Sequence, residues 1–220
     1  MPNRPTDATA RFQGPRLLAL GLLSALFLLP AGHGASAEEA GLSETELVQA
    51  LRDGGHVVFI RHASTEKDYA DQIDAVMGDC STQRTLSEAG WQEARDIGDA
   101  FARLEIPVGP VVSSQYCRAW QTAELAFGEH VKNGDLNFEP AETYTEAQTA
   151  AMRDRVRPHL GTVPAAGENL ILIGHDDPFE AATGIYPEPM GVTYVLRPDG
   201  SGGFEVLGHI DPTAWPESVD

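Results

Sequence analysis

The chain has 220 residues, 42% of them hydrophobic, which suffices for one domain of ordinary size. Fifteen Lys and Arg residues stand against 33 Asp and Glu residues, so the formal net charge is −18 at pH 7. Proteins that bind nucleic acid or anionic membranes need basic patches. The composition therefore argues against both of these partners.

The first 37 residues have the three parts of a secretory signal peptide. Three arginines precede an apolar run over 17–29, and Ala35-Ser36-Ala37 offers a small-x-small cleavage site. The run is shorter than the about 20 apolar residues that span a membrane. We therefore predict cleavage after Ala37 rather than a retained anchor. After cleavage we expect no stable membrane insertion, and we expect the domain over 38–220 to be periplasmic or secreted. Cleavage would move the formal charge from −18 to about −20.

Cys80 and Cys117 are the two cysteines of the chain. An even number of cysteines in an exported protein favours a disulfide. The alternative is two unrelated buried thiols.

The first expected element is a helix over 42–52, where Ser43 and Glu46 form a capping box at its start. A buried strand over 57–60 follows. No periodicity holds over 66–84, which we interpret as a long, lid-like loop. Ser87 caps a second helix, whose apolar stripe makes Trp91 and Phe101 packing residues.

The second half of the chain continues the alternation of strands and helices. Its expected elements are a strand over 111–114, a helix over 116–127, a strand around Asn137-Phe138, a helix over 145–156 ended by Pro158, and strands over 169–173, 192–196 and 204–210. This order predicts an α/β fold, a three-layer α/β/α sandwich with a mainly parallel sheet covered on both faces.

Polar groups follow three of the expected strands. They are Arg61-His62, then Ser113-Ser114 with Arg118 one helical turn beyond, and finally His175. Parallel strands end at the same edge of a sheet, so these groups should converge. Two arginines and two histidines in so acidic a chain indicate an anion, and guanidinium groups match the geometry of phosphate.

Positive charge beside an imidazole favours its neutral form, which is nucleophilic. We therefore expect phosphoryl transfer to His62, stabilised by Arg61, Arg118 and a protonated His175, with no metal or cofactor required. A metal site of these histidines with Asp176 and Asp177 is the alternative, but the two arginines would repel a cation.

These motifs resemble the histidine phosphatase (phosphoglycerate mutase-like) superfamily over roughly residues 42 to 212. The resemblance rests on Arg61-His62-Ala63-Ser64-Thr65, Leu86-Ser87-Glu88-Ala89-Gly90, Ser113-Ser114-Gln115-Tyr116-Cys117-Arg118-Ala119 with Gln121-Thr122-Ala123, and Gly174-His175. It implies a phosphoglycerate mutase-like fold, a phosphohistidine on His62, a phosphate pocket of Arg61, Arg118 and His175, and help from the Thr65 hydroxyl. The chain departs from the family in Ala63, which replaces a glycine, and in Asp68, which replaces an asparagine.

The proton donor remains open between two carboxylates. Asp176 directly follows the second histidine, as in the acid-phosphatase branch of the family, whereas the mutase-like branch uses a glutamate that points to Glu142. We favour Asp176 because the neighbouring His175 fixes its position. Arg84 either reaches the pocket from the 66–84 loop or is a solvated loop arginine.

The sequence thus predicts an exported, cofactor-independent phosphomonoester hydrolase that acts on a small phosphorylated substrate. Mutase activity on phosphoglycerates is disfavoured because those substrates are cytosolic. The alternative is a catalytically weak phosphate-binding module on the same scaffold.

Overall fold

The structure is a computed structural model that describes residues 41–67 and 69–218. The predicted signal peptide and Asp68 lie outside the described residues. Among the helices of the described part, none is long and apolar enough to cross a membrane.

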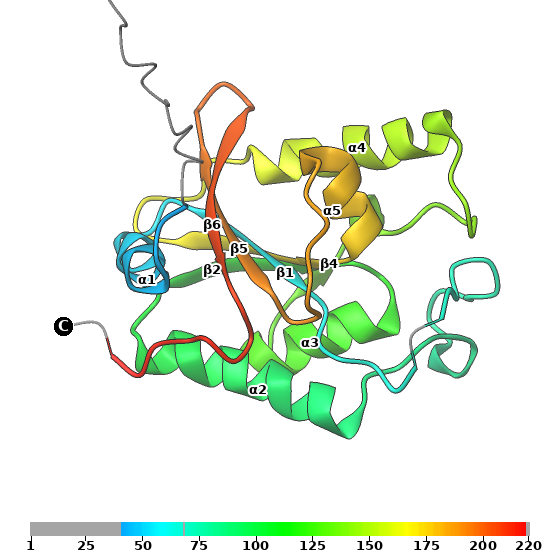
Figure 1. The fold of residues 1–220 in the computed structure, drawn as a ribbon, viewed down its shortest axis with the longest axis horizontal. Coiled ribbons are helices and arrows are strands. Elements are labelled where there is room, and N and C mark those ends of the chain that lie inside the picture. Colours follow the sequence, from blue (N-terminus) through cyan, green and yellow to red (C-terminus); the bar gives the residue numbers. More distant parts are fainter. Residues whose placement is uncertain (1–40, 68, 219–220) are drawn as a thin grey trace, which may run out of the picture. The chain divides into compact units, whose positions relative to one another are not determined.

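A single six-stranded sheet has the order β3-β2-β4-β1-β5-β6 (Figure 1). Strands β3, β2, β4 and β1 run parallel, whereas β5 and β6 pair antiparallel at the other edge. The bounds are β1 Val57–Arg61, β2 Val108–Ser113, β3 Val131–Lys132, β4 Asn169–Gly174, β5 Thr193–Pro198 and β6 Phe204–Ile210. The predicted α/β class is confirmed, with a sheet that is mixed because of β5 and β6.

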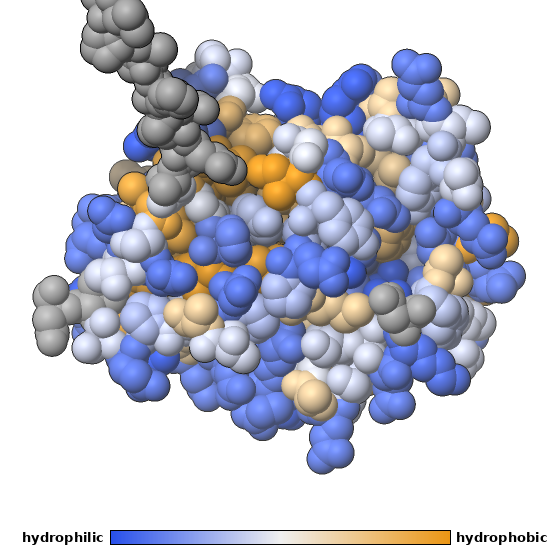
Figure 2. Space-filling view, in the orientation of Figure 1, coloured by the Kyte–Doolittle hydropathy of each residue, from blue (hydrophilic) through white to orange (hydrophobic). Residues whose placement is uncertain are grey.

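Helices pack against both faces of this sheet, as predicted (Figure 1). Their bounds are α1 Glu44–Asp53, α2 Glu88–Arg103, α3 Cys117–Phe127, α4 Glu146–Leu160 and α5 Asp176–Thr183, with short 3-10 helices at Cys80–Thr82 and Gly134–Leu136. Helices α1, α2 and α3 share one apolar core with the sheet, and α4 and α5 share the other. Hydrophilic residues cover most of the face seen in Figure 2.

The central strands are apolar throughout because both of their faces are buried. In β1, Val58 and Ile60 pack into the core under α1, α2 and α3, whereas Val57 and Phe59 pack into the core under α4 and α5. Strand β4 divides its residues between the two cores in the same way. The two strands that lead into the predicted histidines are therefore buried on both faces.

The start of α2 packs directly on the chain that leaves β1. The Ser87 side chain caps the helix by accepting from the backbone N–H of Gly90, and the backbone N–H of Ser87 donates to the Ser64 carbonyl at 3.0 Å. A Cβ atom at Gly90 would lie 1.9 Å from that carbonyl oxygen. Glycine is thus required there, because this contact holds the residues after His62 against α2.

Two expectations about local structure are wrong. Trp91 is 46% exposed, because it borders a small apolar cavity with Trp120 and Leu125 beside α3 rather than entering the core. The expected strand at Asn137-Phe138 is absent from the described residues, and the edge strand is instead β3 at Val131–Lys132. Asn137 uses its side-chain oxygen to accept from the Ser114 hydroxyl and the Gln115 backbone N–H, so it closes a turn.

Helix α4 does not end before Pro158 but continues to Leu160. Proline costs a helical hydrogen bond, and the fully buried side chain of Leu160 offsets this cost by packing into the core. Helix α5 was not predicted. It is short, and Pro178 lies in its first turn, where proline is tolerated.

Candidate active site

Two backbone hydrogen bonds align the ends of three parallel strands. The N–H of His62 donates to the Gly174 carbonyl at 3.0 Å, and the N–H of Ser114 donates to the Ile173 carbonyl at 2.9 Å. The structure thereby brings Arg61, His62, Arg118 and His175 into one buried cluster at the carboxyl edge of the sheet. Their predicted convergence is confirmed.

The His62 imidazole is held in one orientation by two kinds of contact. Its Nδ1 lies 2.9 Å from the Ala63 carbonyl oxygen, which can only accept a hydrogen bond, so Nδ1 carries the proton. Its Nε2 lies 3.1 Å from Nε of Arg118 and 3.4 Å from Nη2 of Arg84. The unprotonated Nε2 therefore points its lone pair toward two guanidinium groups.

Burial and then the charge of Arg118 lower the pKa of His62 well below its ordinary value of 6.5. Arg84 and Arg61 act in the same direction. His62 is thus a neutral imidazole in a cationic surrounding, which is the form that a nucleophile requires.

Ala63 fits where the family has glycine. It is fully buried, and its N–H donates to the Thr122 hydroxyl at 3.0 Å. Within the described residues, Glu105 is the one non-glycine residue with a positive φ, so Ala63 lies in a conformation open to any residue. The Thr122 hydroxyl in turn donates to the Arg118 carbonyl at 2.7 Å, which ties the end of β1 to α3.

His175 is also buried, between the rings of Tyr116 and Phe138. Its Nε2 lies 2.8 Å from the Ser114 hydroxyl, whose own hydrogen goes to Asn137, so Nε2 donates. Its Nδ1 is buried and without a hydrogen-bond partner among the described residues. Burial and then the charge of Arg118 lower the pKa of His175 well below 6.5, which favours its neutral form.

Arg61 is fixed by the segment that follows α5. Its Nη1 donates to the Pro187 carbonyl at 2.9 Å, and its Nη2 donates to Oδ2 of Asp176 at 2.5 Å. Asp176 also accepts at Oδ2 from the Tyr186 hydroxyl at 3.0 Å, and at Oδ1 from the Asp177 backbone N–H at 3.0 Å. Both oxygens of Asp176 are therefore engaged.

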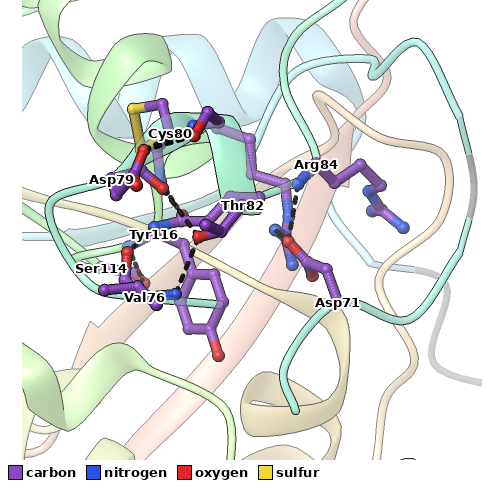
Figure 3. Close-up of a disulfide and its surroundings, with 12 residues drawn as sticks. Asp71, Val76, Asp79, Cys80, Thr82, Arg84, Ser114 and Tyr116 are labelled. Carbon is purple, nitrogen blue, oxygen red and sulfur yellow. Dashed lines mark hydrogen bonds and ion pairs between the residues drawn. A yellow bond between two sulfur atoms is a disulfide. The ribbon is translucent and has the colours of Figure 1, made fainter. Parts of the chain in front are cut away.

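Arg118 forms a buried ion pair that the sequence analysis missed. Its Nη1 donates to Oδ2 of Asp71 at 2.9 Å, and the two side chains are 1% and 2% exposed. The same oxygen accepts from the Arg84 backbone N–H at 2.8 Å, the contact visible in Figure 3. Asp71 lies in an aperiodic loop among several other acidic residues, so no sequence pattern distinguishes it.

A disulfide fastens the 66–84 loop to the first residue of α3 (Figure 3). Cys80 and Cys117 are bonded, with their Cα atoms 5.7 Å apart, and the Cys117 N–H donates to the Gln83 side chain at 2.8 Å. The predicted disulfide is confirmed over two free thiols. Because Cys117 precedes Arg118, the bridge holds the loop beside the site.

Arg84 reaches the site from this loop and is not a solvated loop arginine, which was the alternative. It is 7% exposed, its Nη1 donates to the Tyr69 carbonyl at 3.1 Å, and its Nη2 approaches His62. Thr65 behaves differently, because its hydroxyl donates to the Lys67 carbonyl at 2.8 Å and lies 3.8 Å from the Met190 sulfur. The contacts of Thr65 thus lie outside the His/Arg cluster.

A cavity of about 250 Å³ opens onto the cluster. It contains both candidate proton donors, Asp176 and Glu142, together with Asp177. The full lining is Tyr69, Ala70, Gln72, Arg84, Arg118, Phe138, Glu142, Asp176, Asp177 and Tyr186. Among the residues that the structure describes, no three His, Cys, Asp or Glu side chains are grouped as metal ligands. The arrangement suits an anion bound by guanidinium groups next to a nucleophilic imidazole.

We predict that Asp71→Asn lowers the free energy of unfolding by about 3 kcal/mol, because it leaves the buried charge of Arg118 without its partner. Inorganic phosphate should stabilise this variant more than the wild type, since the anion can replace the lost charge. Thermal melts with and without phosphate test this, with Asp74→Asn in the exposed part of the same loop as the control. Equal stabilisation of all three proteins by phosphate would contradict the prediction.

The lowered pKa of His62 also predicts a pH dependence of stability. Since the folded-state pKa lies below the unfolded value, the contribution is present above pH 6.5 and is lost as the pH falls. Between about pH 7.5 and about pH 5.5 the wild type should lose about 1 kcal/mol of unfolding free energy that the His62→Gln variant does not lose. Urea unfolding at both pH values measures this, and an unchanged loss would show that His62 binds a proton in the folded state.

Comparison with known proteins finds a family model that matches part of the chain. The sequence model of the histidine phosphatase superfamily (branch 1) matches residues 57–136, from β1 to the second 3-10 helix. No curated protein matches the chain significantly.

Three solved structures share the fold. The protein histidine phosphatase SixA complexed with tungstate has a TM-score of 0.51 at 16% identity, covering 71% of this chain and 97% of its own. Mycobacterial hydrolase 1 has a TM-score of 0.52 at 14% identity, with coverages of 70% and 97%. A mycobacterial glucosyl-3-phosphoglycerate phosphatase has a TM-score of 0.51 at 14% identity, with coverages of 69% and 96%. The chain thus shares the fold of these structures, and over the segment that carries Arg61, His62 and Arg118 it is similar to the histidine phosphatase superfamily.

Proposed function

We propose that the protein is a cofactor-independent phosphomonoester hydrolase that forms a phosphohistidine on His62. The observation that carries this proposal is the orientation of His62. Its Nδ1–H donates a hydrogen bond to the Ala63 carbonyl, and its Nε2 lone pair faces Arg118 and Arg84. A phosphate bound by these guanidinium groups would present its phosphorus atom to Nε2.

In the first step, Nε2 of His62 attacks phosphorus, the bond to the ester oxygen breaks, and the leaving alkoxide takes a proton from an acid. In the second step, water attacks the phosphohistidine and the P–N bond breaks. Inorganic phosphate leaves, and the acid that protonated the leaving alkoxide regains a proton from the attacking water. Arg61, Arg84, Arg118 and a protonated His175 would stabilise the charge on the transferring phosphoryl group.

Two buried nitrogen atoms at the site support an anionic ligand. His175 Nδ1 and Arg61 Nε are buried without hydrogen-bond partners among the described residues. A phosphate dianion would raise the pKa of His175 and so create a further cation beside it. Binding would also have to compete with Asp71 for Arg118, which makes the position of the 66–84 loop part of substrate binding.

We also propose that the protein is exported after cleavage behind Ala37. The disulfide between Cys80 and Cys117 supports this, since disulfides persist in oxidising compartments. Expression of the full chain in a Gram-negative host should yield a periplasmic or secreted protein that begins at Glu38. Intact-mass analysis tests this, and a full-length protein in the cytoplasm or membrane would contradict it.

The hydrolase proposal predicts that His62→Ala abolishes hydrolysis of p-nitrophenyl phosphate, a loss of roughly a thousandfold or more, because the nucleophile is gone. EDTA should leave the wild-type rate unchanged. Alkaline quenching with ³²P-labelled substrate should trap label in a base-stable, acid-labile linkage on the wild type and not on the variant. His209→Ala, at a half-exposed histidine on β6, serves as the control and should keep full activity.

The same assay separates the proposal from its alternative. A wild type that binds inorganic phosphate but neither hydrolyses the ester nor traps label would be a phosphate-binding module. Hydrolysis that persists in His62→Ala would show that His62 is not the nucleophile.

A further inference from the structure

The reaction needs an acid, and the structure offers three carboxylates at the cavity. Rupture of the P–O bond leaves an alkoxide, which is a poor leaving group unless it is protonated. Glu142, Asp176 and Asp177 all line the cavity that holds Arg84 and Arg118. The choice among them rests on the proposed phosphohistidine reaction and depends on which carboxyl can carry a proton there.

Asp176 is committed to Arg61. Its Oδ2 accepts from the guanidinium group and from the Tyr186 hydroxyl, and its Oδ1 accepts from the backbone N–H of Asp177. A proton on Oδ2 would have to displace the guanidinium group or the Tyr186 hydroxyl. These contacts favour a role for Asp176 in placing Arg61, whereas the sequence favoured it as the proton donor.

Glu142 is exposed, in the segment that precedes α4. Among the described residues, no hydrogen bond or ion pair fixes its side chain. A general acid has to be held within hydrogen-bond reach of the leaving oxygen, and nothing in the contacts of Glu142 provides this.

Asp177 is half-buried in the first turn of α5, and its side chain is held by a chain of hydrogen bonds. The Tyr144 hydroxyl donates to its Oδ2 at 3.1 Å, and the Gln72 amide donates to the Tyr144 hydroxyl at 3.1 Å. Gln72 follows Asp71, so the 66–84 loop that pairs with Arg118 also positions this carboxyl.

From this geometry we propose that Asp177 is the general acid that protonates the leaving oxygen. The proton moves from the Asp177 carboxyl to the ester oxygen as the P–O bond breaks. The resulting carboxylate then accepts a proton from the water that attacks the phosphohistidine, which restores the acid.

The electrostatic surroundings agree with this role. Burial and then the charge of Asp176 raise the pKa of Asp177, and Glu180 on the same helix acts in the same direction, whereas Arg61 and the Tyr144 hydrogen bond oppose it. Across the cavity the charged or titratable groups are Arg84, Arg118, Glu142, Tyr69 and Tyr186. Asp176 is thus paired with a cation, whereas the raised pKa of Asp177 favours its protonated form.

The test compares leaving groups in the first step. With p-nitrophenyl phosphate, whose leaving group needs little protonation, Asp177→Asn should slow the pre-steady-state burst by less than about fivefold. With glycerol phosphate, whose alkoxide needs a proton, the same variant should lose roughly a hundredfold or more in kcat/KM. Glu142→Gln is the matched control and should change both rates by a similar, small factor.

The pH profile and a positioning variant complete the experiment. The alkaline limb of kcat/KM for glycerol phosphate should disappear in Asp177→Asn, and Tyr144→Phe should shift this limb while leaving the burst with p-nitrophenyl phosphate intact. An equal loss on both substrates in Asp177→Asn, or a selective loss in Glu142→Gln, would overturn the assignment. Absence of any burst or trapped label in the wild type would instead refute the phosphohistidine reaction itself.

Discussion

Three guanidinium groups are buried around His62, and the fold has to offset the cost of taking them out of water. Arg118 is paired with Asp71, Arg61 is paired with Asp176, and Arg84 donates to a backbone carbonyl. None of these partners lies on a central strand. The cations come from β1, α3 and the 66–84 loop, and their partners come from the same loop and from α5 and the chain behind it, so loop and scaffold depend on each other.

This dependence explains why the loop is covalently fastened. An aperiodic segment buries few apolar groups, and its exposed residues include Ile73, Val76 and Met77. The bond between Cys80 and Cys117 limits its freedom in the unfolded state and anchors it one residue from Arg118. Asp71, Gln72 and Arg84 are thereby presented to three different parts of the site.

The sequence was informative wherever the chemistry followed a strand. The apolar runs of β1 and β4 predicted buried strands, and the parallel topology then placed Arg61, His62, Arg118 and His175 together without knowledge of any side-chain contact. The same logic failed for Asp71, which forms an ion pair 47 residues away in the chain, within a segment that has no periodicity. For the proton donor it weighed only Asp176 and Glu142 and did not consider Asp177, because the hydrogen bonds of these carboxyls to Tyr186 and Tyr144 exist only in the tertiary fold. Packing has the same limit. The apolar stripe of α2 indicates which side of the helix faces the core, but it does not show that the core ends before Trp91.

The account depends most on the state of His62, a neutral imidazole with its proton on Nδ1 and its lone pair on Nε2. Long-range ¹H–¹⁵N correlation spectra of the labelled protein report this state directly, because protonated and unprotonated ring nitrogens have well separated shifts. The account predicts a protonated Nδ1 and an unprotonated Nε2 for His62 at neutral pH, unchanged when the pH is lowered to about 5.5. A proton on Nε2, or an imidazolium at neutral pH, would contradict it.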